Sequence, residues 1–170
     1  MYNPVSESSL TRTLIIVNVA AYIGTAVVGG SYIQISSWVL TLLGQSNRLV
    51  LHGYVWQLLT SMFIHVNLIH LLGNMFFLLV FGIGAEVLYG RLQYLIIYFT
   101  SGLLGSFLSL LTGLNSVSAG ASGAIFGLFG AATIYSEKLD SGSIFMALIY
   151  SVYFLVLNIG VNVNVYAHTG

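Results

Sequence analysis

Long apolar runs alternate with short polar breaks along the chain, and the runs approach the length of a membrane-crossing helix. Such a helix places about 20 mostly apolar residues across a hydrocarbon layer of roughly 30 Å. Five stretches qualify: about Leu14 to Ser31, His65 to Ala85, Leu92 to Thr112, Ser122 to Ser136 and Ile144 to Asn158. A further apolar stretch starts near Val165, before the sequence stops at Gly170. The pattern therefore predicts five spans and the start of a sixth.

The segment 32–64, between the first two stretches, has a different composition. It mixes aromatic residues such as Trp38 and Trp56 with Arg48, His52 and other polar residues. Aromatic and basic side chains gather where hydrocarbon meets water. We therefore predict that 32–64 forms a large, partly helical first loop at the membrane surface.

The overall composition is that of a protein whose partner is the lipid bilayer. Of the 170 residues, 58% are hydrophobic and only 5% are charged, whereas a soluble domain carries roughly a quarter charged residues. Backbone in lipid must satisfy its hydrogen bonds internally, so we expect an all-α polytopic membrane protein with 1–170 as one helical-bundle domain. The zero net charge and the lack of a basic run argue against nucleic acid as a partner. Cysteine is absent, which excludes disulfides and thiolate chemistry.

The few charges predict an orientation. If the N-terminus is cytoplasmic, Arg12, Arg91 and Lys138 lie inside and only Arg48 lies outside, in agreement with the positive-inside rule. We therefore expect a multi-pass protein of the plasma membrane with a cytoplasmic N-terminus. The same assignment puts all four acids on the cytoplasmic side: Glu7, Glu86, Glu137 and Asp140.

Three polar clusters lie at or near the ends of the predicted spans. They are His65, His70 and Asn74; Gly120 to Gly123; and Asn164 to His168. The alternating topology brings all three to the non-cytoplasmic side, so groups distant in sequence converge at one depth. Polar groups inside a membrane are costly, and this convergence therefore predicts a functional site.

Ser122 is the candidate nucleophile. The span from Ser122 to Ser136 is only about 22 Å long, and Glu137 and Lys138 fix its far end at the cytoplasmic surface. Ser122 should then lie roughly 8 Å below the opposite surface, at a helix N-terminus whose free amides suit a developing oxyanion. Gly120 and Gly123 allow a substrate backbone to come close. The alternative is that Ser122 only caps the helix.

His168 is the candidate general base for Ser122, because a neutral imidazole can accept the hydroxyl proton. Every acid falls on the other side of the membrane, so the sequence favours a Ser–His dyad over a triad. The alternative for His168 is a hydrogen-bonded packing residue.

His70 and Asn74 are four residues apart and share one helix face, so both can donate to an oxyanion beside the Ser122 amide. The alternative is polar contact between helices. His65 is interpreted as a structural residue, and its spacing from His70 does not suit a metal site. Phe126 lies one turn after Ser122, where its ring can stack on His168 or simply pack. Small residues on the same span predict close helix approach: Gly123, Gly127 and Gly130.

These residues resemble the rhomboid family of intramembrane serine proteases. The matching blocks are WQLLTSMFIH at 56–65, HLLGN at 70–74, Glu86 before Tyr89-Gly90, GASGAIFG at 120–127, and Ala167-His168. The likeness covers most of the chain in the same order and spacing, and the combined pattern is highly specific.

The resemblance implies a six-helix core around a water-filled cavity that opens to the outer side, with 32–64 as the membrane-embedded first loop and 159–166 as a mobile cap. It implies cleavage of transmembrane protein substrates without metal or cofactor. Ser122 would be the nucleophile and His168 the base. The oxyanion hole would comprise His70, Asn74 and the Ser122 backbone, and Phe126 would lie beneath the catalytic histidine.

Two features depart from the family pattern. The Trp-Arg pair of the first loop is Trp56-Gln57 here, which predicts weaker anchoring of that loop. The family's sixth helix continues well beyond the position of His168, whereas this sequence stops at Gly170. We therefore expect the 170 residues to be a truncated form that is weakly active or inactive.

Two other functions fit a bundle of this kind. A catalytically silent rhomboid-like protein that binds membrane clients should lack the serine or the histidine, and both are present. A transporter or channel should carry paired polar residues near the midplane, and the spans contain few. An aspartyl intramembrane protease needs two aspartates, and Asp140 is the only one.

Overall fold

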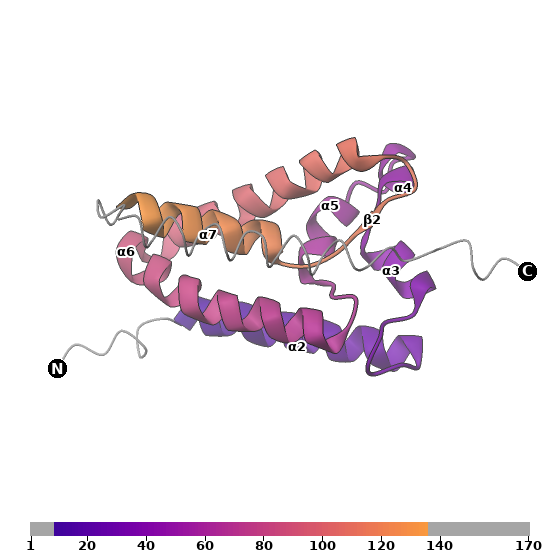
Figure 1. Cartoon of the computed structure of the whole chain (residues 1–170), viewed down its shortest axis with the longest axis horizontal. Coiled ribbons are helices and arrows are strands. Elements are labelled where there is room, and N and C mark those ends of the chain that lie inside the picture. Colours follow the sequence, from indigo (N-terminus) through magenta and orange to yellow (C-terminus); the bar gives the residue numbers. More distant parts are fainter. Residues whose placement is uncertain (1–8, 136–170) are drawn as a thin grey trace, which may run out of the picture.

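The computed structural model describes residues 9–135, and its helices carry the labels of Figure 1. The long helices are α2 (Ser9–Gly29), α6 (Leu68–Ser109) and α7 (Ser122–Tyr135). The short elements are α3 (Ser37–Leu43), β1 (Gln45–Ser46), α4 (Asn47–Leu51), α5 (Gln57–Thr60), η1 (Ser61–Phe63), η2 (Leu110–Thr112) and β2 (Val117–Ser118). The described part of the chain is therefore mostly helical, as predicted.

Gly90 divides α6 into two antiparallel helices. Its backbone angles, φ 73° and ψ 175°, interrupt the helix, and such a positive φ suits glycine. Figure 1 shows α6 running in one direction, turning and returning beside itself. The two halves correspond to the predicted spans from His65 to Ala85 and from Leu92 to Thr112, although the first half begins at Leu68.

The described helices include two elements that are long and apolar enough to cross a membrane, Ser9–Gly29 and Leu68–Thr112. The second is 45 residues long and contains the turn at Gly90, so its two halves account for two of the predicted spans. The predicted fifth span, Ile144 to Asn158, and the restart near Val165 lie outside the described residues.

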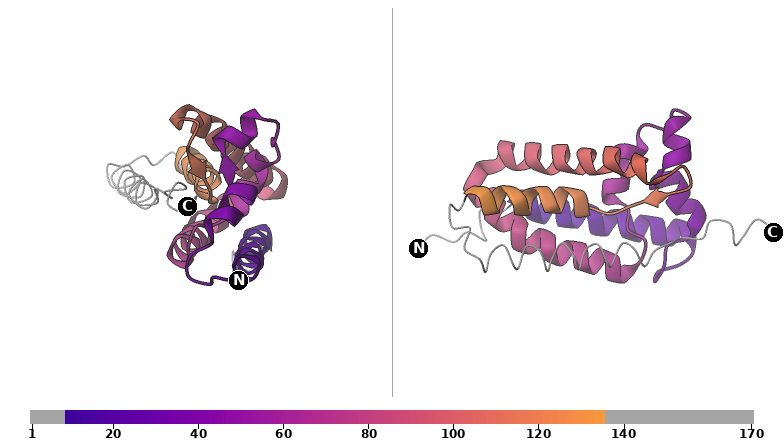
Figure 2. Two further views of the ribbon diagram at one scale, coloured as in Figure 1. Left: turned by 90° about the vertical axis from the view of Figure 1, so that its right-hand side faces the viewer. Right: turned by 45° about the horizontal axis from the view of Figure 1, so that its top comes forward.

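Contacts between the elements define two ends of the bundle (Figures 1 and 2). At one end, the start of α2 meets Glu86, close to the turn of α6. At the other, the chain after α2 pairs with the chain before α6, where Ile35 N donates to Val66 O and Leu68 N donates to Ile33 O. The first loop and the start of α7 lie at this second end, which is called the loop end below.

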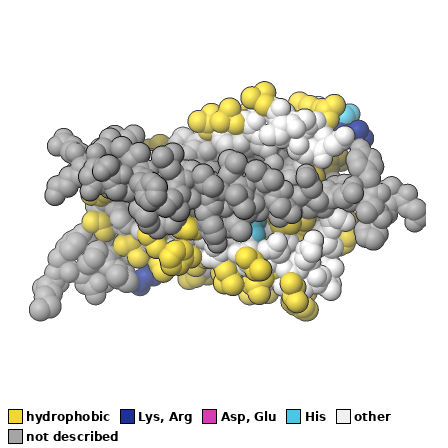
Figure 3. Space-filling view, in the orientation of Figure 1, with side chains coloured by type: hydrophobic (Ala, Val, Ile, Leu, Met, Phe, Trp, Pro, Cys, Tyr) yellow, Lys and Arg dark blue, Asp and Glu magenta, His cyan; other side chains and the backbone are white. Residues whose placement is uncertain are grey.

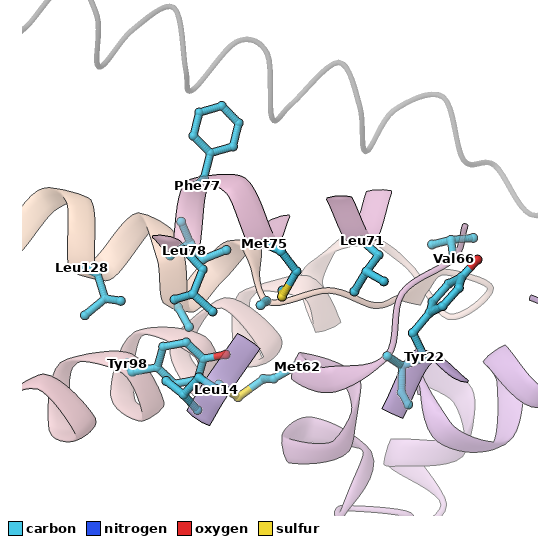
Figure 4. Packing of buried hydrophobic residues seen from close by; sticks show 14 of the residues in the cluster. Leu14, Tyr22, Met62, Val66, Leu71, Met75, Phe77, Leu78, Tyr98 and Leu128 are labelled. Atoms are coloured by element: carbon cyan, nitrogen blue, oxygen red, sulfur yellow. The ribbon is translucent and has the colours of Figure 1, made fainter. Parts of the chain in front are cut away.

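The core lies between α2, α6, α7 and the first loop. Tyr94, Tyr98, Leu78 and Leu128 are fully buried, and Figure 4 shows packed residues from all four parts. Large apolar side chains also cover the outside of the helices: Ile16, Ile23, Val27, Ile69, Leu72, Phe76, Leu92, Leu104 and Leu108 are exposed. In Figure 3, apolar side chains of the described residues gather along the upper and lower edges of the visible face, and the Lys and Arg that can be seen lie towards its two ends. A surface of this kind suits lipid.

The first loop, predicted as 32–64, contains α3, β1, α4, α5 and η1 and is therefore partly helical. Gln57 anchors it from a fully buried position. Its Nε2 donates to Thr41 O at 2.8 Å and to Leu42 O at 3.0 Å, and its Oε1 accepts from Ser46 N at 2.9 Å. The neutral amide thus makes three hydrogen bonds where the sequence predicted weak anchoring.

α2 begins at Ser9, five residues before the predicted Leu14. The buried Glu86 carboxylate explains this, because it accepts hydrogen bonds from Leu10 N and Thr11 N, each at 2.9 Å, and from Thr11 Oγ1 at 2.8 Å. The first amides of a helix have no partner within it. A negative group at that position satisfies them and interacts favourably with the helix dipole. Glu86 therefore anchors the start of α2 to the first half of α6.

We predict that Glu86→Ala lowers the free energy of unfolding by about 1.5–3 kcal/mol, because buried amides and a hydroxyl lose a charged acceptor. Glu86→Gln retains one carbonyl oxygen and should lose less. Thermal unfolding in detergent measures both variants. Thr100→Val is the control, since Thr100 is exposed and bonds only within its own helix. Equal midpoints for Glu86→Ala and Thr100→Val would contradict the role of Glu86.

Candidate active site

Ser122 is the first residue of α7 and lines a cavity of about 340 Å³ at the loop end of the bundle. Ile125 N donates to Ala121 O at 3.0 Å, so the N-cap position belongs to Ala121. The hydroxyl of Ser122 therefore lies within the first turn, where backbone amides are free of intrahelical partners. The polar side chains that line the cavity, among the described residues, are Gln45, Ser61, Ser106, Ser109, Ser118 and Ser122.

His70 and Asn74 lie against the backbone that leads into Ser122. A methyl group built on Gly120 would be 2.7 Å from His70 Cε1, 3.0 Å from His70 Nε2 and 3.9 Å from Asn74 Oδ1. Gly120 also has φ +122°, a conformation that favours glycine. The structure thus brings together two of the polar clusters singled out in the sequence, 70–74 and 120–123.

The polar atoms of His70 and Asn74 are buried but incompletely paired. His70 is 5% exposed and Asn74 is 1% exposed. Among the described residues, both ring nitrogens of His70 and the Oδ1 of Asn74 lack hydrogen-bond partners, while Asn74 Nδ2 donates to His70 O at 2.9 Å. Since buried polar groups are usually satisfied, unpaired groups beside Ser122 are available to a ligand. The second Asn74 Nδ2 hydrogen and a His70 N–H are the donors.

His65 supports the His70 ring from behind. It precedes α6, is fully buried, and its ring centroid lies 5.3 Å from that of His70. Burial, together with the neighbouring His70, lowers the pKa of His65 to about 3, so its ring is neutral at physiological pH. The sequence prediction of a structural loop residue agrees with this position.

Glycines bring the start of α7 against the second half of α6. A methyl group on Gly123 would lie 3.6 Å from Gly105 Cα and 3.7 Å from Gly102 Cα, and one on Gly127 would lie 1.9 Å from Ser101 Oγ. Gly123 and Gly127 therefore permit the close approach predicted for this span. At Gly130, no atom of the described residues lies within 4 Å of the corresponding methyl position.

Three further residues were considered from the sequence: the aromatic Phe126, the candidate base His168 and the acid Glu86. Phe126 is half-buried and lines the cavity. His168, the candidate base, lies outside the described residues. Glu86 is twelve residues after Asn74 on the same helix, a separation of about 18 Å at 1.5 Å per residue. Among the described residues, no acid is therefore placed to form a triad at Ser122.

Sequence reasoning missed Ser61, Gln45 and Asn47. Ser61 O accepts a hydrogen bond from Gly120 N at 2.9 Å, so the first loop holds the residue that contacts His70. Gln45 lines the cavity, and both Gln45 and Asn47 are fully buried. The signal for them was available: the polar run Gln45-Ser46-Asn47 lies in a loop of an apolar protein, where such side chains must find internal partners.

We predict that Gly120→Ala destabilises the protein far more than Gly113→Ala. Both positions have positive φ, +122° and +112°, but no atom lies within 4 Å of a methyl group at Gly113. Alanine at either position should therefore cause backbone strain of a similar kind. Only Gly120→Ala adds a clash with His70. Thermal unfolding in detergent measures the difference. Similar midpoints would show that His70 does not contact Gly120.

Comparisons with known proteins agree with the geometry. A family model described as the Rhomboid domain matches residues 52–170. The chain is 38% identical over 123 residues to RHOMBOID-like protein 6, mitochondrial, of Arabidopsis thaliana, covering 68% of this chain and 39% of that protein. It is 30% identical over 164 residues to Rhomboid-like protease 3 of Toxoplasma gondii, covering 91% and 62%. It is 34% identical over 118 residues to Rhomboid protease GluP of Bacillus subtilis (strain 168), covering 68% and 23%.

The chain spans between 33% and 41% of the length of the first three Arabidopsis relatives. The family match covers more than half of the chain and includes both described polar clusters, 70–74 and 120–123. The apolar surface and the long apolar helices fit an integral membrane protein. The chain belongs to the rhomboid family.

Proposed function

We propose that the protein is an intramembrane serine endopeptidase that cleaves transmembrane protein substrates with a Ser122–His168 dyad. One observation carries the proposal: the first turn of α7 presents Ser122 to a cavity while His70 and Asn74 lie against the preceding Gly120. The nucleophile thus lines the cavity, and the two hydrogen-bond donors lie against Gly120, which lines the same cavity. Two relatives bear protease names, Rhomboid-like protease 3 and Rhomboid protease GluP, and these names support the same reaction class.

The proposed reaction begins when Ser122 Oγ attacks the scissile carbonyl and His168 accepts the hydroxyl proton. The carbonyl oxygen becomes an oxyanion, which the Ser122 amide, His70 and Asn74 stabilise by hydrogen bonds. The tetrahedral intermediate collapses, and His168 returns the proton to the departing amine. A water molecule then hydrolyses the acyl-enzyme by the same steps in reverse order. No metal or cofactor takes part in this scheme.

The buried position of the donors suits this role. Donors in a site that excludes bulk water interact more strongly with a developing charge than exposed donors do. His70 and Asn74 are held rigidly, since they share one face of α6 and Asn74 Nδ2 donates to His70 O. Little reorganisation is then needed as the oxyanion forms.

The topology supports a site that opens to the non-cytoplasmic side. The loop end carries Ser122, His70 and the first loop, while Arg12, Glu86 and Arg91 belong to the opposite end. With a cytoplasmic N-terminus, as the positive charges predict, substrates would be cut near the outer surface. The plasma membrane is the proposed location. One relative is named as mitochondrial, so a localisation experiment should compare the plasma membrane with the mitochondrion.

We predict that a fluorophosphonate probe labels the protein at Ser122, since this reagent traps an activated serine. Ser122→Ala should abolish labelling, and His168→Ala should weaken it by about 10²-fold or more. Ser118→Ala is the control, because Ser118 lines the same cavity. Labelling at another residue, or no labelling at all, would favour a silent protein that binds membrane clients.

We predict that Asn74→Ala lowers kcat by about 10²-fold while changing KM little, because its contact strengthens in the transition state. Steady-state cleavage of a transmembrane substrate measures both constants. Asn18→Ala is the matched control, since Asn18 is equally buried but its Nδ2 bonds within α2, to Leu14 O. A rise in KM with unchanged kcat would place Asn74 in substrate binding and remove it from the oxyanion hole.

A further inference from the structure

The segment 113–121, which leads into Ser122, is fastened to the first loop along its whole length. β1 and β2 pair antiparallel, with Gln45 opposite Ser118 and Ser46 opposite Val117. Asn47 N donates to Ser116 O at 3.1 Å, and Gly120 N donates to Ser61 O at 2.9 Å. The position of the nucleophile therefore depends on residues more than sixty positions earlier in the chain.

Asn47 is the centre of this connection. Its Nδ2 donates to Ser109 O and to Gly113 O, both at 2.8 Å, and its Oδ1 accepts from Gln45 Nε2 at 3.1 Å. Gly113 begins the segment that leads to Ser122, whereas Ser109 ends α6. One fully buried amide thus ties the end of α6, the start of that segment and the first loop together.

Gln45 extends the connection towards the cavity. Its Nε2 also donates to Ser106 O at 2.8 Å, and Ser106 Oγ donates to Leu58 O at 2.9 Å. Ser106 and Gln45 both line the cavity beside Ser122. The chain of bonds therefore reaches from the first loop, through the last turns of α6, to the wall of the candidate active site.

We propose that Asn47, assisted by Gln45, is a positioning residue that holds Ser122 in its reactive place by fastening 113–121 to the first loop. This inference rests on the proposed function, because it concerns the reactivity of the same serine. Removing the Asn47 donors takes one hydrogen bond from each of the two carbonyls, Ser109 O and Gly113 O, and so loosens the attachment of the segment that ends at Ser122. A displacement of about 1 Å at a reacting group can cost 10²-fold in rate.

The test compares the rate of fluorophosphonate labelling at Ser122 in Asn47→Asp with the rate in the unchanged protein. Aspartate has the same shape but lacks both donors, so its oxygen would face the carbonyls of Ser109 and Gly113. We expect the rate of fluorophosphonate labelling, corrected for the folded fraction, to fall by about tenfold or more. Asn47→Gln keeps the amide and should recover part of the rate.

Asn18→Ala separates positioning from general stability. Asn18 is also a fully buried asparagine, but its Nδ2 donates to Leu14 O of its own helix and has no link to the segment 113–121 among the described contacts. It should lower the thermal midpoint while leaving the corrected labelling rate unchanged. If Asn47→Asp labels as fast as Asn18→Ala at equal folded fraction, the positioning role is wrong while the proposed function stands. If the unchanged protein does not label at Ser122, the proposed function is wrong, and the positioning role that rests on it is wrong as well.

A disulfide provides the second measurement, and it applies even if Asn47→Asp does not fold. The chain has no cysteine, so Ser46→Cys with Val117→Cys introduces one pair, at positions that face each other across the strands and within disulfide reach. The disulfide should form readily, and the protein that carries it should be labelled at Ser122 at the native rate. In the Asn47→Asp background the disulfide should restore labelling, and its reduction should abolish this rescue. Failure of the pair to form, or lack of rescue in a folded protein, would overturn the proposal.

Discussion

Polar groups that fold inside an apolar protein must find their partners within that protein, and both ends of this bundle are organised by that constraint. At one end the Glu86 carboxylate accepts from two amides and a hydroxyl at the start of α2. At the loop end, the amides of Gln45, Asn47 and Gln57 satisfy backbone carbonyls of the first loop, of α6 and of the segment before α7. The helices between these ends are joined mainly by apolar contacts.

The candidate site is one of the places in the described residues where this constraint is left unmet. The ring nitrogens of His70 and the Oδ1 of Asn74 are buried without partners, next to Gly120. Ser122 follows on the first turn of α7, where amides also lack intrahelical partners. Unpaired groups cost stability, so a protein that keeps them beside a cavity retains capacity to bind a developing charge.

The same packing that closes the bundle also fixes the nucleophile. Gly123 and Gly127 let α7 lie directly against Gly102, Gly105 and Ser101 of α6, which sets where the helix begins. The pairing of β1 with β2 sets how the chain enters it. Ser122, the candidate nucleophile, is thus held from two sides, by close helix contact along α7 and by hydrogen bonds to the first loop.

The sequence by itself determined what depends on local composition. Apolar runs of membrane length located α2, both halves of α6 and the start of α7, because lipid demands such runs. The spacing of His70 and Asn74 put them on one helix face, and the glycines around Ser122 indicated close approach. Family membership followed from the combined motifs, and the match over residues 52–170 confirms it.

Only the tertiary structure decided what depends on partners distant in the chain. Glu86 anchors the first described turn of α2, because its carboxylate accepts hydrogen bonds from amides 75 or more residues away. Gln57 proved to be a buried anchor, and Asn47 a junction between 45–61 and 109–118, since their hydrogen bonds join segments that no periodicity connects. The contact of Gly120 with His70 likewise arises from packing between elements. A sequence pattern records which side chains are polar, whereas the fold decides which backbone groups they meet.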